Sequence, residues 1–180
     1  MAQERGHGTE RGGEAPPFVS TTYIRTTPER LWQALTEPAF TRRYWGVALT
    51  SEWTPGAKVT WEQEGVTIAD PAQVVLVSEP PRRLAYTWHT MTPEFARSVG
   101  LDDELYVKVS AERRSQVTFV LEPVGDLVRL TVTHDGFEPG SAVRRMVGEG
   151  WPRILSDLKS LLETGATFTA DGLSADGARG

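Results

Sequence analysis

The sequence of 180 residues contains no cysteine. A chain without cysteine forms no disulfide framework, no thiolate metal site and no cysteine nucleophile. The sequence also lacks any apolar run near the roughly 20 residues that a membrane-spanning helix needs, and its polar, glycine-rich N-terminus lacks the apolar segment of a secretory signal. These absences predict a cytoplasmic protein that has no membrane partner.

The sequence also has no excess of positive charge. The chain has 19 Lys and Arg against 24 Asp and Glu, which gives a net charge of −5. Proteins that bind nucleic acid usually carry a basic face. The four arginine pairs of this sequence are scattered along the chain, and we expect them to be solvated rather than to form such a face. The charge balance therefore predicts no nucleic-acid partner.

Motifs that hold metals or cofactors are absent too. The three histidines, His7, His89 and His134, show no metal-ligand spacing, and no phosphate-binding or dinucleotide-binding loop is present. We expect no metal and no cofactor. Asp135 follows His134, but neighbouring residues of a strand point to opposite faces, so the two cannot form a base and its orienting carboxylate within one strand.

The most regular stretch that is present is GWPRILSDLKSLLETG, residues 150–165. Its apolar residues are spaced by three and four, which places them on one face of an α-helix. We expect this helix to run from an N-cap at Ser141 to Thr164, to bend near Pro152 and to stop at Gly165. The apolar residues on its face are Trp151, Ile154, Leu155, Leu158, Leu161 and Leu162.

Before this helix the sequence predicts a strand at 18–27, a helix that starts with Thr27 as N-cap and Pro28 at its first position, and a second short helix at 39–45. Strand-like runs then extend to about residue 90, and a hairpin follows that turns at 124–126. The predicted fold class is α+β, a curved antiparallel sheet of about six to seven strands wrapped on the long C-terminal helix. The predicted domain spans 17–165, between disordered tails at 1–16 and 166–180.

Three stretches resemble a known family. RTTPERLWQALTEP (25–38) resembles the opening motif of the START-like, helix-grip (SRPBCC) superfamily. PPRRL (80–84) with YTW (86–88), TVTHDGF (131–137) and the final helix resemble the branch of the heat-shock-chaperone ATPase activator homologues. The resemblance covers about residues 18–164 and implies a helix-grip fold, in which a cavity between sheet and long helix commonly holds an apolar small molecule.

Strand alternation places many aromatic residues on the inner face of the predicted sheet, opposite the final helix. They either fill a solid core or line a cavity. If a cavity is present, the predicted ligand-binding residues are Trp32, Trp61, Tyr86, Trp88, Phe95, Phe119, His134, Met146 and Trp151.

Residues 91–115 depart from the minimal family pattern, which connects the two flanking strands more directly. Thr92-Pro93-Glu94 and Asp102 begin two predicted helices. One interpretation is a lid over the cavity mouth, and the other is a surface insertion that only shields a sheet edge. The predicted lid residues are Phe95, Gly100, Leu101 and Leu105.

Two classes of function stay open. The resemblance implies a monomer that binds a hydrophobic, aromatic or polycyclic small molecule, for natural-product sequestration or antibiotic self-resistance. In enediyne self-resistance proteins of this fold, protection can involve hydrogen abstraction from a glycine, for which Gly100 is the candidate. The alternative is a polyketide aromatase/cyclase in which His134 or Tyr86 moves a proton. A chaperone ATPase co-factor is a third hypothesis, drawn from the family's name.

Overall fold

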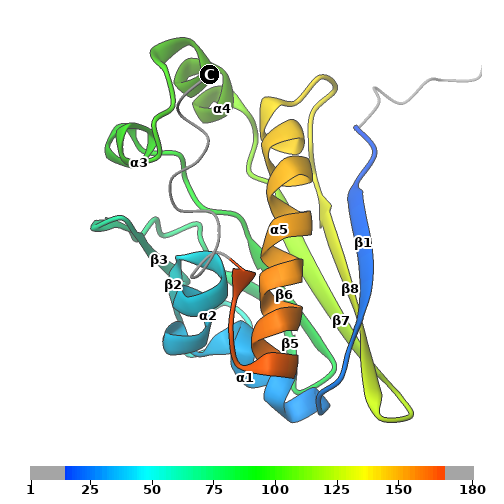
Figure 1. Cartoon of the computed structure of the whole chain (residues 1–180). Coiled ribbons are helices and arrows are strands. Elements are labelled where there is room, and N and C mark those ends of the chain that lie inside the picture. Colours follow the sequence, from blue (N-terminus) through cyan, green and yellow to red (C-terminus); the bar gives the residue numbers. More distant parts are fainter. Residues whose placement is uncertain (1–14, 169–180) are drawn as a thin grey trace, which may run out of the picture.

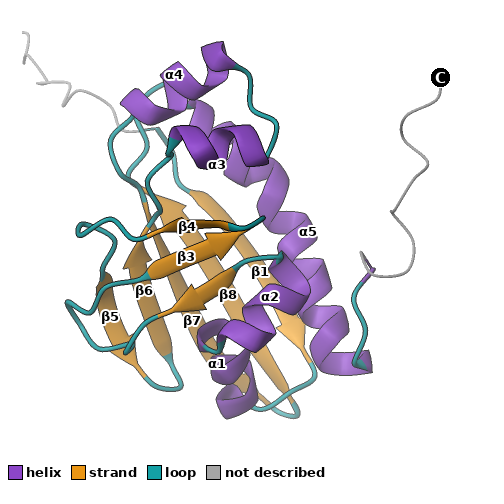
Figure 2. Ribbon diagram, turned by 90° about the vertical axis from the view of Figure 1, so that its left-hand side faces the viewer, coloured by secondary structure: helices purple, strands orange, loops and turns teal. Residues whose placement is uncertain are grey.

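The computed structural model describes residues 15–168. An open antiparallel sheet lies against the long helix α5, and the shorter helices and a second small sheet cover the remaining side (Figures 1 and 2). In chain order the elements are β1 (Phe18–Ile24), α1 (Pro28–Thr36), α2 (Pro38–Trp45), β2 (Ala48–Thr50), β3 (Thr60–Gln63), β4 (Val66–Ile68), β5 (Val75–Glu79), β6 (Arg83–Thr87), α3 (Pro93–Ser98), α4 (Asp103–Ala111), β7 (Gln116–Val124), β8 (Leu127–Asp135) and α5 (Ala142–Thr164).

The strands divide between two sheets. One has five strands in the order β1-β8-β7-β6-β5, and the other has three in the order β2-β3-β4. The sequence predicts the strands but places them in one sheet, because a period of two identifies a strand without identifying its partner. The sheets nearly join: Gly56 N donates to Val75 O at 2.8 Å, and Val59 N donates to Gln73 O at 2.8 Å. The register of β5 on β6 shifts between Val75 and Val77 at this junction.

Strands β7 and β8 form the longest hairpin and follow the predicted alternation. Their register runs from Gln116 opposite Asp135 to Val124 opposite Leu127, with a two-residue turn at Gly125 and Asp126. Every second residue of β8 is buried, which places His134 on the inner face. The inner face of this hairpin is the floor on which α5 lies.

Helices α1 and α2 begin and end where local chemistry predicts. The hydroxyl of Thr27 accepts a hydrogen bond from Arg30 N at 3.2 Å, and Pro28 occupies the first helical turn. Glu37 separates the two helices, and α2 ends at Gly46 with φ = 80°, a left-handed conformation that favours glycine. Trp45 is the last residue of α2, so the cap at Gly46 fixes the position of the Trp45 backbone.

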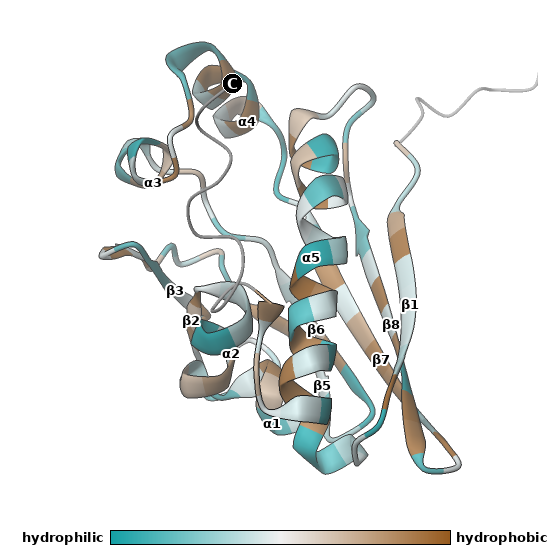
Figure 3. Cartoon of the chain, in the orientation of Figure 1, coloured by the Kyte–Doolittle hydropathy of each residue, from teal (hydrophilic) through white to brown (hydrophobic). Residues whose placement is uncertain are grey.

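Helix α5 has 23 residues and continues through Pro152. The hydroxyl of Ser141 accepts from Arg144 N at 2.9 Å, and Gly165 caps the C-terminus with φ = 83°. Hydrophilic and hydrophobic segments alternate along the helix in Figure 3, as expected of an amphipathic helix. Its apolar face packs on β1 and α2.

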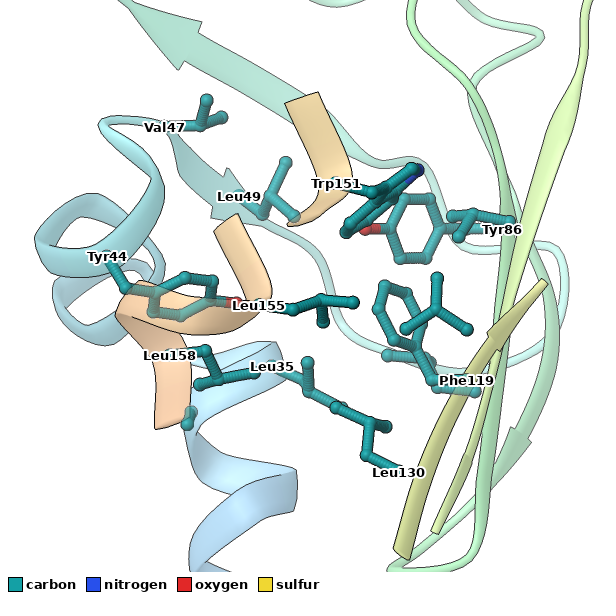
Figure 4. Close-up of a cluster of buried hydrophobic side chains, with 14 of the residues drawn as sticks. Leu35, Tyr44, Val47, Leu49, Tyr86, Phe119, Leu130, Trp151, Leu155 and Leu158 are labelled. Carbon is teal, nitrogen blue, oxygen red and sulfur yellow. The ribbon is translucent and has the colours of Figure 1, made fainter. Parts of the chain in front are cut away.

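The tightly packed part of the core lies between the C-terminal half of α5, α1, α2 and the sheet (Figure 4). Leu155 and Leu158 project from α5 toward Leu35 of α1 and Tyr44 of α2. Leu158 and Leu161 keep 1 % and 2 % of their surface exposed. Tyr86 and Phe119 stack with ring centroids 5.9 Å apart on the sheet side of this core.

Most residues of the predicted tails, 1–16 and 166–180, lie outside the described residues. Of the described ones, Ala15 N donates to Phe137 O at 3.1 Å, and Phe168 N donates to the Asp157 carboxylate at 2.7 Å.

Candidate functional site

A cavity of about 450 Å³ lies at the N-terminal half of α5, between that helix, the small sheet and the insertion that contains α3 and α4. It is lined by Trp45, Trp61, Gln63, Trp88, His89, Thr90, Met91, Phe95, Val99, Leu101, Val109, Ser110, Glu112, Arg113, Arg114, Ser115, Val143, Met146, Val147, Gly150, Trp151 and Ile154.

Four of the six tryptophans line the cavity and contact one another. The ring of Trp45 lies 5.0 Å from that of Trp61, 5.8 Å from that of Trp88 and 5.3 Å from that of Trp151, measured between centroids. The rings of Trp61 and Trp88 meet edge to face at 5.2 Å. We call these four residues the tryptophan cluster. It offers the large aromatic surface that suits a flat aromatic ligand.

Behind the tryptophan cluster, His134 joins Trp151 to Ser115. The indole nitrogen of Trp151 donates to His134 Nδ1 at 3.1 Å, and His134 Nε2 lies 2.8 Å from Ser115 Oγ. His134 is fully buried, and burial lowers the pKa of its imidazole to about 3, with the nearby His89 and Arg144 lowering it further. The imidazole is therefore neutral at physiological pH.

His89 forms part of the cavity wall. Its Nδ1 lies 3.0 Å from the carbonyl oxygen of Thr90, so Nδ1 carries the proton and Nε2 keeps a lone pair. Its ring lies 4.4 Å from that of Trp61 and 4.9 Å from that of Phe95. Burial lowers the pKa of His89 to about 4, so this ring is also neutral near pH 7.

Three consecutive charged residues, Glu112, Arg113 and Arg114, tie the end of the insertion to the rest of the domain. The Glu112 carboxylate accepts from Ala142 N at 2.6 Å and from the Ser141 hydroxyl, and so caps the N-terminus of α5. The Arg113 guanidinium donates to the carbonyl oxygens of residues 136 and 137.

Arg114 connects the insertion to the loop that follows the small sheet. Its guanidinium donates to Trp88 O at 2.7 Å, to the Thr90 hydroxyl at 2.8 Å and to the Asp70 carboxylate at 3.1 Å. The Thr90 hydroxyl also donates to Asp70, and this bond is the main reason why the pKa of Asp70 is lowered. The charges of this group are balanced within the protein.

Helices α3 and α4 stand over the N-terminal end of α5 (Figures 1 and 2). Thr92 caps α3 by accepting from Phe95 N at 3.2 Å, and Asp102 caps α4 by accepting from Leu105 N at 2.8 Å. The two helices thus form as the sequence predicts. From this insertion Phe95, Val99, Leu101 and Val109 reach the cavity.

The residues predicted to bind a ligand divide into three groups. Trp61, Trp88, Phe95, Met146 and Trp151 line the cavity, as does the predicted lid residue Leu101. His134 lies behind the wall formed by Trp88 and Trp151, with its ring 4.5 Å from that of Trp88.

The third group does not line the cavity. Tyr86 and Phe119 pack in the solid core, and Trp32 is a partly buried residue of α1. Gly100 has φ = 72°, and a Cβ added there would meet no atom within 4 Å. Gly100 and Leu105 belong to the insertion without bordering the cavity.

Sequence reasoning missed Trp45, Ser115 and Gly150 as cavity residues. Trp45 ends a short helix whose inner face the sequence does not define. Ser115 precedes β7 and carries no motif. Gly150 was available as a signal, since a glycine on the apolar face of a helix leaves space where a side chain would pack.

Residues 15–168 contain no group of three His, Cys, Asp or Glu side chains that could hold a metal ion. Within the same residues, no helix has the length and apolar character that crossing a membrane requires.

Comparison with known proteins identifies the family. Residues 25–163 match the AHSA1 family, described as Activator of Hsp90 ATPase homolog 1-like protein. Because the match covers most of the chain, the protein belongs to this family. No curated protein matches the sequence.

Solved structures share the fold. Protein MLL2253 from Mesorhizobium loti is 25% identical, with a TM-score of 0.62, and the match covers 82% of this chain and 96% of that chain. CalU16 from Micromonospora echinospora is 21% identical (TM-score 0.58; 86% and 78% covered). DynU16, a protein of the dynemicin biosynthetic locus, is 19% identical (TM-score 0.62). The match covers 84% of this chain but only 48% of DynU16.

Proposed function

We propose that this member of the AHSA1 family binds a neutral, aromatic or polycyclic small molecule between its sheet, α5 and the α3–α4 insertion. The observation that carries the proposal is the cavity of about 450 Å³ with the tryptophan cluster in its wall. Small-molecule sites commonly measure roughly 300–1,000 Å³ and combine an apolar wall with a few polar groups. A side chain of any size would fill part of this space, yet α5 places Gly150 there.

A neutral ligand is favoured because the charges at the cavity are already balanced. Glu112 caps α5, Arg114 pairs with Asp70, and Arg113 donates to backbone carbonyls. A charged ligand group would have to compete with these partners and would lose its hydration without gaining a new counter-charge. His89 and His134 are both uncharged near pH 7.

The same contacts count against the cyclase alternative. His134 Nδ1 is occupied by the indole N–H of Trp151, so His134 cannot take a proton from a ligand at that atom. Burial raises the pKa of Tyr86 well above its ordinary value, which makes its hydroxyl a poor acid or base at neutral pH. The chaperone co-factor hypothesis has only the family's name in its support.

We further propose that binding serves to sequester a natural product, and so to protect the producing cell. The support is the likeness of this fold to DynU16, a protein of the dynemicin biosynthetic locus. A cavity that covers an aromatic ligand on several sides limits the access of other molecules to it. Under this proposal the protein acts stoichiometrically and does not turn over its ligand.

Binding is tested by quenching of tryptophan fluorescence and by amide chemical-shift changes with a panel of polycyclic aromatic compounds. The blocking variant is Gly150→Leu. A Cβ at Gly150 lies 4.0 Å from Ile154 Cδ1, an ordinary contact, so the new side chain starts without a clash and extends into the cavity. We expect it to weaken binding about tenfold or more.

The matched control is Glu149→Leu, which adds the same side chain at an exposed neighbouring position of α5. It should bind the panel like the original protein. Equal binding by both variants, with both folded by circular dichroism, would place the ligand outside the cavity. Protection is tested separately, by expressing each variant in a bacterium sensitive to the bound compound; unchanged sensitivity with intact binding would remove the sequestration role alone.

A further inference from the structure

In the hydrogen bonds behind the tryptophan cluster, the chemistry of each group determines which atom is the donor and which is the acceptor. An indole N–H can donate a hydrogen bond but cannot accept one. Because Trp151 Nε1 donates to His134 Nδ1 at 3.1 Å, that nitrogen must present its lone pair. The imidazole is neutral, since burial lowers its pKa to about 3. Its single N–H hydrogen therefore lies on Nε2.

Nε2 must then donate to Ser115 Oγ, 2.8 Å away. This polarity is the reverse of that in a serine–histidine pair that activates a nucleophile, where the imidazole accepts the hydroxyl hydrogen. The histidine instead occupies a lone pair of the serine oxygen. As a result, the hydroxyl hydrogen of Ser115 is directed away from His134.

The hydroxyl hydrogen of Ser115 has no acceptor among residues 15–168, although the residue is only 4 % exposed. Ser115 lines the cavity, and its carbonyl oxygen accepts from Trp88 N at 2.8 Å, which fixes its backbone. We propose that the Ser115 hydroxyl, oriented by Trp151 and His134, donates a hydrogen bond to a carbonyl or quinone oxygen of the ligand.

Other polar groups of the wall agree with an acceptor-bearing ligand. Trp45 and Trp88 line the cavity, and within the described chain neither indole N–H has a hydrogen-bond partner. These two N–H groups are donors that a ligand oxygen could engage, and His89 Nε2 is an acceptor in the same wall. This inference rests on the proposed function and narrows its ligand class to aromatic ketones and quinones, as opposed to aromatic hydrocarbons.

The test compares fluorenone with fluorene, which have the same three rings and differ only by a carbonyl in place of a methylene group. Affinities are measured by tryptophan fluorescence, and the carbonyl stretch of bound fluorenone is measured by infrared difference spectroscopy. We expect the protein to prefer fluorenone by about five- to tenfold, as one hydrogen bond allows. The carbonyl stretch should move to lower frequency on binding.

Ser115→Ala removes the donor. Fluorenone should then bind about as weakly as fluorene, its carbonyl stretch should lose the shift, and fluorene affinity should change less than about twofold. Ser115→Cys keeps nearly the same volume with a weaker donor and should fall between the two, which provides a second variant if the alanine protein is unstable.

Trp151→Phe tests the orienting role without altering Ser115. It keeps an aromatic wall but frees His134 Nδ1, so the imidazole can place its hydrogen there and accept from the Ser115 hydroxyl. The preference for fluorenone should drop below that of the original protein. Carbon and nitrogen chemical shifts of His134 should report the Nε2–H form in the original protein and a mixture in the variant.

Three outcomes would overturn the inference. Equal affinities for fluorenone and fluorene in the original protein would show that the ligand carbonyl accepts no hydrogen bond there. This result would refute the inference without contradicting the proposed function. An unaltered preference in Ser115→Ala assigns the contact to another donor. Failure of both compounds to bind refutes the inference, and failure of the wider panel as well refutes the small-molecule function.

Discussion

The two halves of α5 lie on the same sheet but pack differently. In the C-terminal half, Leu155 and Leu158 fill the space between the helix, α1, α2 and the sheet, and Leu161 is buried in the same core. In the N-terminal half, Met146, Gly150 and Trp151 border a cavity of about 450 Å³. The difference shows that one amphipathic helix can close a core at one end and leave a cavity at the other.

The cavity persists because its borders are held apart by specific contacts. Glu112 attaches the end of the insertion to the N-terminus of α5, and Arg114 attaches it to Asp70. The rings of Trp45 and Trp88 pack on that of Trp151, 5.3 and 5.8 Å away between centroids, which fixes this wall of the cavity against α5. In the C-terminal half, Lys159 donates to Tyr23 O and Glu163 accepts from Arg25 N, and the aliphatic side chains between helix and sheet are almost fully buried.

The largest effect is expected from Leu158→Ala in the solid half. Leu158 keeps 1 % of its surface exposed, so its truncation should lower the free energy of unfolding by about 2–5 kcal/mol. Met146→Ala, in the partly exposed cavity wall, is the matched comparison and should cost roughly 1 kcal/mol or less. Urea denaturation measures both; equal costs would mean that the halves are packed alike.

As the pH falls, the two buried histidines at the cavity should lower the stability of the protein before protonation of the carboxylates does. Burial lowers the pKa of His134 to about 3 and that of His89 to about 4, from 6.5. Between pH 6.5 and these values the unfolded chain binds more protons, so stability falls as pH falls. Each histidine contributes about 1.4 kcal/mol per pH unit.

The measurement is urea denaturation from pH 7.5 to 4.5. Stability supported by carboxylates with lowered pKa, such as Glu122 and Glu163, is lost only below their ordinary value of 4.5. His134→Asn keeps an acceptor for Trp151 but does not titrate, so it should halve the slope. An identical slope in both proteins would contradict the neutral, buried state of His134.

A smaller effect is expected at the attachment of the insertion. Glu112→Gln removes the negative charge at the N-terminus of α5 and should cost about 1–2 kcal/mol. It should also speed amide hydrogen exchange in α4. Glu104→Gln is the control, because Glu104 is exposed and its ion pair among the described residues is with Lys108 on the surface of α4. If the two variants lose equal stability, Glu112 does not anchor the insertion.

The smallest effect is expected for Tyr86→Phe. Tyr86 is buried in the solid core, and its hydroxyl makes no hydrogen bond within residues 15–168. Removing the hydroxyl should therefore change stability by less than about 1 kcal/mol, in either direction. Ligand affinity should stay the same, because Tyr86 does not line the cavity. A large loss of affinity would mean that the ligand contacts Tyr86 and binds closer to the sheet.

The sequence by itself determines the helices, the strands and the family. Thr27, Ser141 and Gly165 act as caps through bonds to residues within a few positions of themselves, which is why their roles are readable from the chain. The apolar period of α5 likewise identifies its buried face. These signals are local, and the fold class that they predict is the one observed.

Only the tertiary structure decides which inward residues meet the cavity. Alternation places Tyr86 and Trp88 on one face of the sheet, yet Tyr86 lies in the solid core and Trp88 in the cavity wall. Trp45 reaches the site from the end of the helix predicted at 39–45 and Ser115 from the residue before β7, and neither position indicates a cavity in the sequence. Periodicity distinguishes residues that face the core from residues that face solvent. Whether a core-facing residue borders the cavity depends on where it lies along the sheet and on how the insertion packs over it, and both depend on contacts between segments distant in the chain.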